Sequence, residues 1–188
     1  MTKSGLPAVL ILLNIGVRNS PMTLDEFTAA FGGAYEHSPW AAKRGFDPDF
    51  SSSCCVIPAM RKAVDAASAP EQDALIKAHP DLAGKLALSG SLTVSSTKEQ
   101  AGAGLDQCSP RELKKFQKYN GAYAAKFGFP FIVAVKGLSR KDILKAFKKR
   151  LKNSEAEERQ TALEQIHKIA AIRIEAWFTQ EALRHGNT

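Results

Sequence analysis

Two short motifs carry side chains that are able to move a proton or hold a polar ligand. HPDLAGK (79–85) has His79 directly before Pro80, and SSTKEQAGAGLD (95–106) has Glu99 and Gln100 ahead of a run of small residues. Imidazole titrates near neutral pH, a carboxylate accepts hydrogen bonds, and a primary amide both donates and accepts them. This combination suits general acid–base chemistry on a polar organic molecule.

Two later segments offer groups that would complete such a site. KFGFPFIVAVKG (126–137) contains the apolar run PFIVAV, which is bounded by Pro130 and Gly137 and fits either a short strand or a buried extended segment. IAAIRIEAW has Arg173 in the middle of an otherwise apolar helical stretch, where its guanidinium offers fixed donors to an anion.

Each of these residues also has a purely structural explanation. A single histidine at a helix end often only packs there, and Glu99 suits the first turn of a helix because the helix dipole favours an acid. Gln100 fits an exposed position, Arg173 fits an ion pair across a helical bundle, and PFIVAV fits ordinary core. The residue types and their spacing leave both interpretations open.

The elements that must position these residues are predicted to be almost entirely helical. Helix-start signals of the capping-box type occur at Thr23–Glu26, Ser109–Glu112, Ser139–Asp142 and Ser154–Glu157. Ser38 and Pro39 fit one more start, and Pro70 opens a helix that His79-Pro80 interrupts. The helix after Ser109 is expected to reach about Phe127, with a buried face formed by Leu113, Phe116, Tyr119, Ala122 and Tyr123. We expect an all-α single-domain bundle of about seven or more helices with one short extended buried connector.

Composition places the chain among ordinary globular proteins. It has 188 residues, 44% of them hydrophobic and 24% charged, which suits one domain with a substantial core. The three cysteines form no CxxC pair, and the four histidines are dispersed, so we expect no metal site and a reducing compartment.

Much of the net charge of +7 comes from residues 136–152, which hold eight Lys or Arg and one Asp. Such a run is able to meet nucleic acid, but Ile143, Leu144, Phe147 and Leu151 recur in it at helical spacing. We therefore favour the solvated face of a helix.

The apolar run 6–17 is too short to span a bilayer, and no A-x-A-like cleavage site follows it. We interpret residues 1–21 as an N-terminal extension, either a short extra helix or the product of an upstream start codon. Residues 22–188 are then the main domain.

The motifs YEHSPW, AHPDLAGKL, SSTKEQAGAGLD and YAAKFGFPFIVAVKG, followed by IAAIRI, resemble the 2-oxo-4-hydroxy-4-carboxy-5-ureidoimidazoline (OHCU) decarboxylase family of urate degradation. The resemblance runs from about Leu24 to about Trp177, and the motifs occur in the family's order. It implies an all-helical enzyme that uses no metal or organic cofactor and commonly forms a homodimer.

The resemblance also implies roles for individual residues. His79 falls at the family's catalytic histidine, and Glu99 is the second residue that we expect to take part in catalysis. The substrate-binding positions implied are Pro80, Ser96, Thr97, Lys98, Glu99, Gln100, Phe131, Ile132, Val133, Ala134, Val135 and Arg173. The sequence departs from the family where Ile follows Arg173, and the Cys54-Cys55 region matches it poorly.

We accordingly expect a cytoplasmic, cofactor-free carboxy-lyase that converts OHCU to (S)-allantoin, with no nucleic-acid or membrane partner. A basic helical nucleic-acid-binding module is one alternative. A catalytically lapsed relative that acts as a partner subunit is another, although intact His79, Glu99 and Gln100 argue against it.

Overall fold

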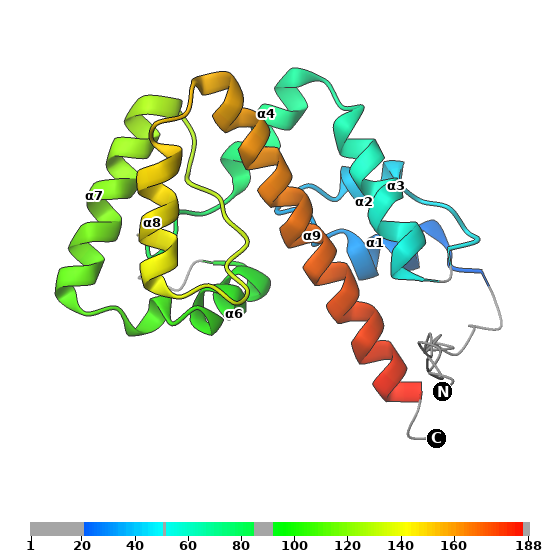
Figure 1. Ribbon diagram of the computed structural model, residues 1–188. Helices are drawn as coiled ribbons and strands as arrows, with labels where there is room; N and C mark the ends of the chain where they lie inside the picture. Colours follow the sequence, from blue (N-terminus) through cyan, green and yellow to red (C-terminus); the bar gives the residue numbers. More distant parts are fainter. Residues whose placement is uncertain (1–20, 51, 85–91, 186–188) are drawn as a thin grey trace, which may run out of the picture.

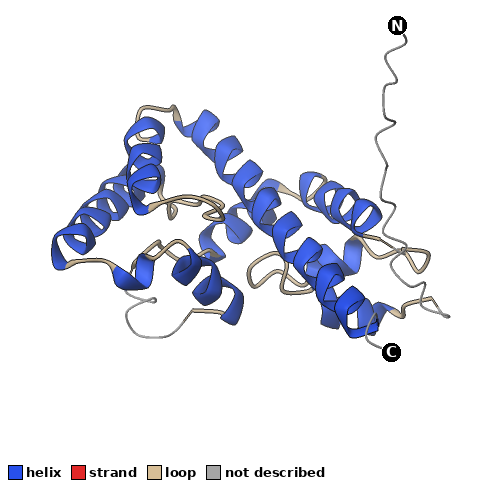
Figure 2. Cartoon of the chain, turned by 60° about the horizontal axis from the view of Figure 1, so that its bottom comes forward, coloured by secondary structure: helices blue, strands red, loops and turns tan. Residues whose placement is uncertain are grey.

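The computed structural model describes residues 21–50, 52–84 and 92–185, and within these ranges the chain consists of helices and loops (Figures 1 and 2). The helices that precede His79 are α1 (Leu24–Phe31), α2 (Trp40–Arg44), α3 (Ser53–Asp65) and α4 (Ala69–Ala78). Those that follow are α6 (Val94–Gly102), the 3₁₀ turn η1 (Leu105–Gln107), α7 (Pro110–Phe127), α8 (Arg140–Arg150) and α9 (Glu155–His185). The expectation of an all-α fold is confirmed.

Local capping explains where most of these helices begin. Reciprocal capping boxes close the first turns of α1, α7 and α8, through Thr23 with Glu26, Ser109 with Glu112, and Ser139 with Asp142. Ser154 and Glu157 make the same contacts ahead of α9. The start expected at Ser38 differs: α2 begins at Trp40 with Pro39 as its N-cap, and no side chain caps it.

The 31-residue helix α9 joins the two halves of the molecule. It packs against α3 and α4 on one side and against α7 on the other, and it crosses the whole structure diagonally in Figure 1. Residues of α9 that are far apart along the helix therefore contact different groups of helices. Arg173 lies in the second half of this helix.

The interior is divided into two apolar clusters, and the connector between α7 and α8 lies between them. Ile132 belongs to the cluster formed by α1–α4 and α9, whereas Phe131 and Val135 belong to the cluster formed by α7, α8 and η1. Successive side chains of an extended backbone point to opposite sides, which explains this alternation. The segment expected to be a strand or an extended connector is extended, and it forms no strand.

The buried face of α7 differs from the expected face at two positions. Phe116 and Tyr123 are buried as predicted, but Ala122 is exposed and Asn120 is buried instead. The Nδ2 amide of Asn120 donates a hydrogen bond of 2.9 Å to the carbonyl of Leu82. A buried polar side chain thus occupies a core position that apolar periodicity does not identify, and its Oδ1 has no hydrogen-bond partner among the described residues.

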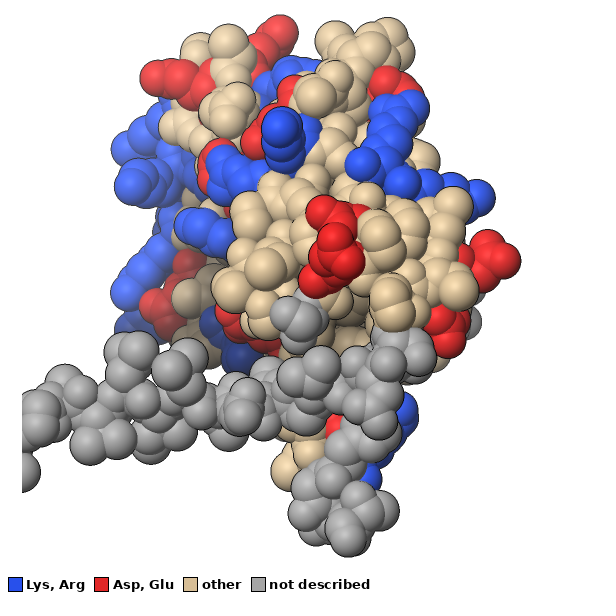
Figure 3. Space-filling model, turned by 90° about the vertical axis from the view of Figure 1, so that its right-hand side faces the viewer, with Lys and Arg blue, Asp and Glu red and all other residues tan. Residues whose placement is uncertain are grey.

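The basic run forms α8 and its flanks, with most of its lysines exposed and with Ile143 and Phe147 buried. Arg150 is an exception, because it is buried against Glu158 of α9. Positive charge is unevenly spread: on the face shown in Figure 3, Lys and Arg gather toward the left edge and uncharged residues cover much of the middle.

None of the described helices is long and apolar enough to cross a membrane. The predicted N-terminal extension, apart from Pro21, lies outside the described residues, and so do residues 85–91.

Candidate active site

His79 ends α4 in an extended backbone conformation, with φ −75° and ψ 139°. The following Pro80 explains this, because a proline ring disfavours helical geometry in the residue before it. The ring nitrogen Nδ1 lies 2.9 Å from the carbonyl oxygen of Leu75, one helical turn earlier. A carbonyl only accepts hydrogen bonds, so Nδ1 carries the proton and Nε2 of the neutral ring holds a lone pair.

This second nitrogen is the unsatisfied atom of the site. His79 is 7% exposed, and its Nε2 is buried without a hydrogen-bond partner. Burial lowers the pKa of His79 to about 4, although the Leu75 carbonyl and the charge of Glu36 act in the opposite direction. The imidazole is therefore neutral at pH 7, with a bare acceptor facing the adjacent pocket.

Helix α6 presents one face to the same pocket. Its N-cap residue Thr93 accepts a hydrogen bond from the backbone N–H of Ser96, and helical spacing then brings Ser96, Glu99 and Gln100 to one side. Of the binding residues implied on this helix, Thr97 and Lys98 are exposed and lie outside the pocket lining.

The Gln100 amide holds the backbone that follows Pro80. Its Oε1 accepts a hydrogen bond of 3.0 Å from the Ala83 N–H, and its Nε2 donates to the Asp81 carbonyl at 3.3 Å. Ala83 has a positive φ of 48°, a conformation that L-residues with a side chain seldom adopt. Gln100 thus fixes a strained loop at the pocket wall.

The connector supplies the apolar wall, with Phe131, Ile132, Val133 and Val135 lining the pocket. Ala134 points elsewhere, and its backbone N–H donates to Gln165 Oε1 of α9 at 3.0 Å. Arg150 donates to the Ile132 carbonyl at 2.5 Å and lies over the Phe131 ring, 4.6 Å from its centroid. Side chains from α8 and α9 therefore hold this connector in position, although it pairs with no neighbouring strand in the described part of the chain.

Arg173 enters the site from α9, and its guanidinium is engaged on every side. Nε and Nη2 donate to the two oxygens of Glu99 at 2.7 and 2.9 Å, a bidentate pair. Nη1 donates to Glu36 Oε2 at 2.7 Å and to the carbonyls of Gly33 and Ala34 at 3.1 and 3.4 Å. Burial alone would lower the pKa of Arg173, but Glu99 and Glu36 outweigh it and raise that pKa.

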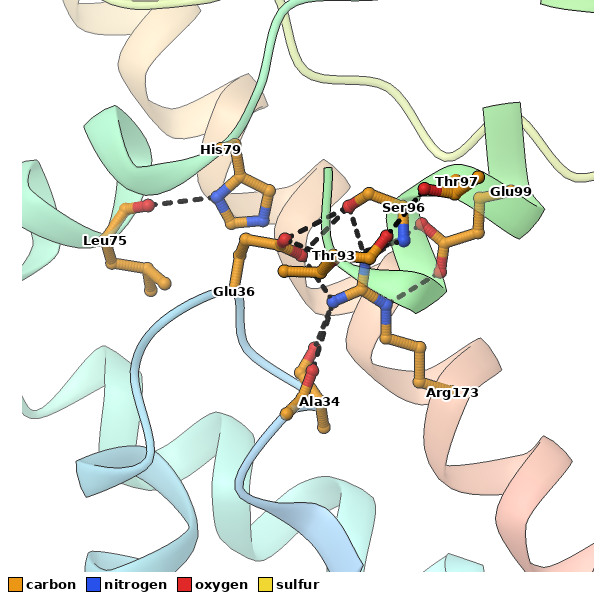
Figure 4. Close-up of polar contacts among 10 residues, drawn as sticks. Ala34, Glu36, Leu75, His79, Thr93, Ser96, Thr97, Glu99 and Arg173 are labelled. Atoms are coloured by element: carbon orange, nitrogen blue, oxygen red, sulfur yellow. Dashed lines mark hydrogen bonds and ion pairs between the residues drawn. The ribbon is translucent and has the colours of Figure 1, made fainter. Parts of the chain in front are cut away.

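These groups surround one small pocket with a cavity volume of about 30 Å³, which lies where the two apolar clusters meet. It brings together most of the residues predicted from the sequence: His79, Pro80, Ser96, Glu99, Gln100, Phe131, Ile132, Val133, Val135 and Arg173. Leu82 and Ile169 complete the lining. Figure 4 shows His79, Ser96, Glu99 and Arg173 converging from three separate segments.

The family model described as OHCU decarboxylase matches residues 20–175, which include every residue of this pocket. The chain is 41% identical over 158 residues to the 2-oxo-4-hydroxy-4-carboxy-5-ureidoimidazoline decarboxylase of Haloferax volcanii, across 84% of this chain and 92% of that protein. It is 43% identical over 152 residues to the protein of the same name from Halalkalicoccus jeotgali, across 80% and 84% of the two chains.

The chain belongs to the OHCU decarboxylase family. Among solved structures, one titled as a crystal structure of (S)-allantoin synthase is similar at a TM-score of 0.66 and 28% identity, over 83% of this chain and 51% of that one. A second, titled as OHCU decarboxylase in the presence of (S)-allantoin, has a TM-score of 0.63 at 23% identity, over 82% and 98%. At 23% identity, the second structure shows a shared fold only.

One residue of this OHCU decarboxylase family member is missing from the sequence-based site. Glu36, in the YEHSPW motif, is 2% exposed and bonds to Arg173, Thr93 and Ser96. Burial by itself raises the pKa of Glu36, but the Thr93 hydroxyl and the Arg173 charge outweigh it and hold that pKa below its usual value. The motif indicated a helix start at Ser38 and Pro39, whereas the ionic contacts of Glu36 to α9 had no local signal.

Proposed function

We propose that this chain decarboxylates OHCU to (S)-allantoin in urate degradation, as a carboxy-lyase that needs no cofactor. The observation that carries the proposal is the convergence of an unpaired histidine nitrogen, an arginine–glutamate pair and an extended backbone on one pocket. Membership of the OHCU decarboxylase family and the names of the relatives from Haloferax and Halalkalicoccus support it.

The substrate can supply its own electron sink. OHCU carries a hydroxyl and a carboxylate on one ring carbon, next to a ring C=N. When the bond to the carboxylate breaks, its electron pair moves into the C=N, CO₂ leaves, and an enol remains with a negative nitrogen. That nitrogen takes a proton, and the enol becomes a ketone as its hydroxyl proton leaves and a proton adds to the neighbouring ring carbon. Delivery of that last proton to one face sets the configuration of the product.

In this mechanism His79 moves the proton. Its Nε2 is the free acceptor of a neutral ring, so we assign it the removal of the hydroxyl proton and the return of a proton to ring carbon. The Leu75 carbonyl holds the tautomer in which Nε2, and not Nδ1, faces the substrate.

Glu99 and Arg173 are assigned to the polar end of the substrate. The N–H groups of Arg173 are already engaged by Glu99, Glu36, Ser96 and two carbonyls. A substrate carboxylate or carbonyl therefore meets Arg173 only where Glu99 gives way, and Glu99 then becomes available to the substrate hydroxyl. In the structure, the polar partner of Glu99 is Arg173.

The connector and α6 are assigned to the substrate ring. Backbone N–H and C=O groups of 131–135, other than the Ile132 carbonyl and the Ala134 N–H that are already bonded, pair with ring amides without adding charge. The apolar side chains of Phe131, Val133 and Val135 exclude water beside the carboxylate. Loss of CO₂ disperses the negative charge, so a dry wall favours the transition state over the ground state.

The test is to generate the unstable substrate in place with urate oxidase and hydroxyisourate hydrolase and to follow circular dichroism. Added protein should speed the appearance of (S)-allantoin well above the spontaneous rate, and should do so after dialysis against a metal chelator. A rate equal to background would refute the proposed function. Loss of the acceleration after dialysis would refute the cofactor-free mechanism.

We further propose a cytoplasmic homodimer without a nucleic-acid partner. Two arginines of the basic run are used inside the fold, Arg140 on Glu112 and Arg150 on Glu158, which leaves less positive charge for a polyanion. Light scattering should give twice the mass of one chain, and labelled DNA or RNA should not bind even at low salt. Binding that weakens steeply with salt would revive the nucleic-acid alternative.

A further inference from the structure

Two carboxylates share the guanidinium of Arg173, and they differ in their surroundings. The Glu99 side chain is 25% exposed and lines the pocket, whereas the Glu36 side chain is 1% exposed and lies outside the pocket lining. Within the part of the chain that the structure describes, Glu99 accepts hydrogen bonds from Arg173 alone. Glu36 takes them from Arg173, from the Thr93 hydroxyl at 2.6 Å and from the Ser96 hydroxyl at 3.1 Å.

We propose that Glu36 is a positioning residue, the permanent counter-ion that holds Arg173 and Ser96 while Glu99 exchanges Arg173 for substrate. The inference rests on the proposed function. A buried arginine left without a partner is strongly unfavourable, so Glu99 can release Arg173 only if another anion remains in contact. Glu36 meets this need because it accepts from Nη1 of Arg173, whereas Glu99 accepts from Nε and Nη2, so the Glu36 contact does not depend on Glu99.

The loop that carries Glu36 is itself held by a second contact with α9, through the neighbouring Tyr35. The hydroxyl of Tyr35 lies 2.8 Å from His167 Nδ1, and His167 Nε2 lies 3.0 Å from Asp65 Oδ1. Because a carboxylate accepts and does not donate, Nε2 carries the proton and Tyr35 donates to Nδ1. This chain of hydrogen bonds, which is buried at Tyr35 and His167 and exposed at Asp65, joins α3, α9 and the loop, and it fixes the residue next to Glu36.

Two more features lock the same loop. His37 has a positive φ of 49°, which costs energy in a residue with a side chain and persists only where the surroundings enforce it. The carbonyls of Gly33 and Ala34 accept hydrogen bonds from Arg173 Nη1, so the backbone reinforces the contact that the Glu36 carboxylate makes. Figure 4 shows Glu36 between His79 and Arg173, with Ala34 below the guanidinium.

The test compares Glu36→Gln with wild type in the coupled allantoin assay. Glutamine keeps the size of the side chain and an acceptor for Thr93 but removes the charge. Glu99 is then the only carboxylate bound to Arg173, and we expect the guanidinium to shift from the position where it meets the substrate. We expect KM to rise and kcat/KM to fall about 10- to 100-fold, the usual effect of one hydrogen bond to a charged group. Simple loss of folded protein would lower kcat and leave KM unchanged.

Glu164→Gln is the matched control. Glu164 lies on α9 and pairs with Arg61 of α3, and neither residue lines the pocket. It should leave KM at the wild-type value. Glu36→Asp keeps the charge one methylene further back, and its KM should fall between those of wild type and Glu36→Gln. It also serves as the test if the glutamine variant does not fold.

The outcomes separate this inference from the proposed function. If wild type makes no (S)-allantoin above background, the function itself fails. If wild type is active and a folded Glu36→Gln protein keeps KM within about twofold, the positioning role is wrong. An equal change in KM for Glu36→Gln and Glu164→Gln would also overturn it, since the effect would then follow from any lost ion pair on α9.

Discussion

At the scale of single residues, the chemistry depends on which nitrogen of His79 is free. The Leu75 carbonyl accepts a hydrogen bond from the Nδ1–H group, and burial keeps the ring neutral. Nε2 is therefore left without a partner beside the pocket. A histidine that merely packed at a helix end would have both nitrogens satisfied or exposed to water. The unpaired nitrogen is the local feature that distinguishes a reactive histidine here.

Replacing His79 tests this at the same scale. We expect His79→Ala to lower kcat by about 10²- to 10⁴-fold, the usual contribution of a positioned acid–base group, while the protein stays folded. The coupled assay measures the first effect and thermal unfolding the second. A folded variant with more than a tenth of wild-type activity would rule out the proton-transfer role.

The pH dependence follows from the lowered pKa of His79. The neutral ring is the active form in the proposed mechanism, and a pKa of about 4 keeps it neutral until the solution is strongly acidic. The acid limb of kcat/KM, which reports the free enzyme, should therefore lie well below the ordinary histidine value of about 6.5. Circular dichroism at each pH checks that the fold persists. A half-maximal rate near pH 6.5 would contradict the assignment.

At the scale of elements, the pocket depends on segments that have no regular hydrogen bonding of their own. The connector between α7 and α8 is held by Arg150 at the Ile132 carbonyl and by Gln165 at the Ala134 N–H. The loop after Pro80 is held by Gln100 and Asn120. Rigid helices thus use side chains to fix the backbone that we expect to contact the substrate.

Gln165→Met tests this support. The variant fills the same space but leaves the Ala134 N–H without its partner, which should cost about 1–3 kcal/mol of unfolding free energy and raise KM as the connector loosens. Gln160→Met, at an exposed position of the same helix, is the control and should leave both quantities unchanged. Equal denaturation midpoints and KM values for the two variants would show that the contact is dispensable.

At the scale of the whole molecule, α9 couples the two halves. Side chains of α9 pair with Arg61 and Asp65 of α3 and with Arg150 of α8. Arg173 of α9 itself pairs with Glu36 in the loop before α2. The pocket lies where these halves meet, so no single group of helices contains the site. The domain boundary at Met22 stays a prediction, and the family model begins at residue 20.

That boundary gives a prediction about the complete chain. A protein that starts at Met22 should keep its thermal midpoint and its kcat/KM within about twofold, because the Thr23–Glu26 capping box and all pocket residues remain. Starting at Phe27 removes the capping box and should lower the midpoint, since a lost cap costs about 1 kcal/mol. A large loss of activity in the first protein would assign residues 1–21 a role.

What the sequence determines by itself is local. Capping pairs three residues apart indicate most helix starts, Pro80 fixes the backbone of His79, and the alternation of PFIVAV gives an extended segment between two cores. Local patterns fail where a polar side chain is buried, as with Asn120 and Arg150, because its partner lies on another element of the fold.

Tertiary structure alone decided the ionic arrangement of the pocket. Glu36 and Arg173 are 137 residues apart, and Glu99 and Arg173 are 74 apart. Periodicity and motif spacing carry no information about which charges meet when α1–α4, α6 and α9 pack together. The sequence supplied a histidine, a glutamate and an arginine, while packing made Arg173 the shared partner of two carboxylates and left Nε2 of His79 free.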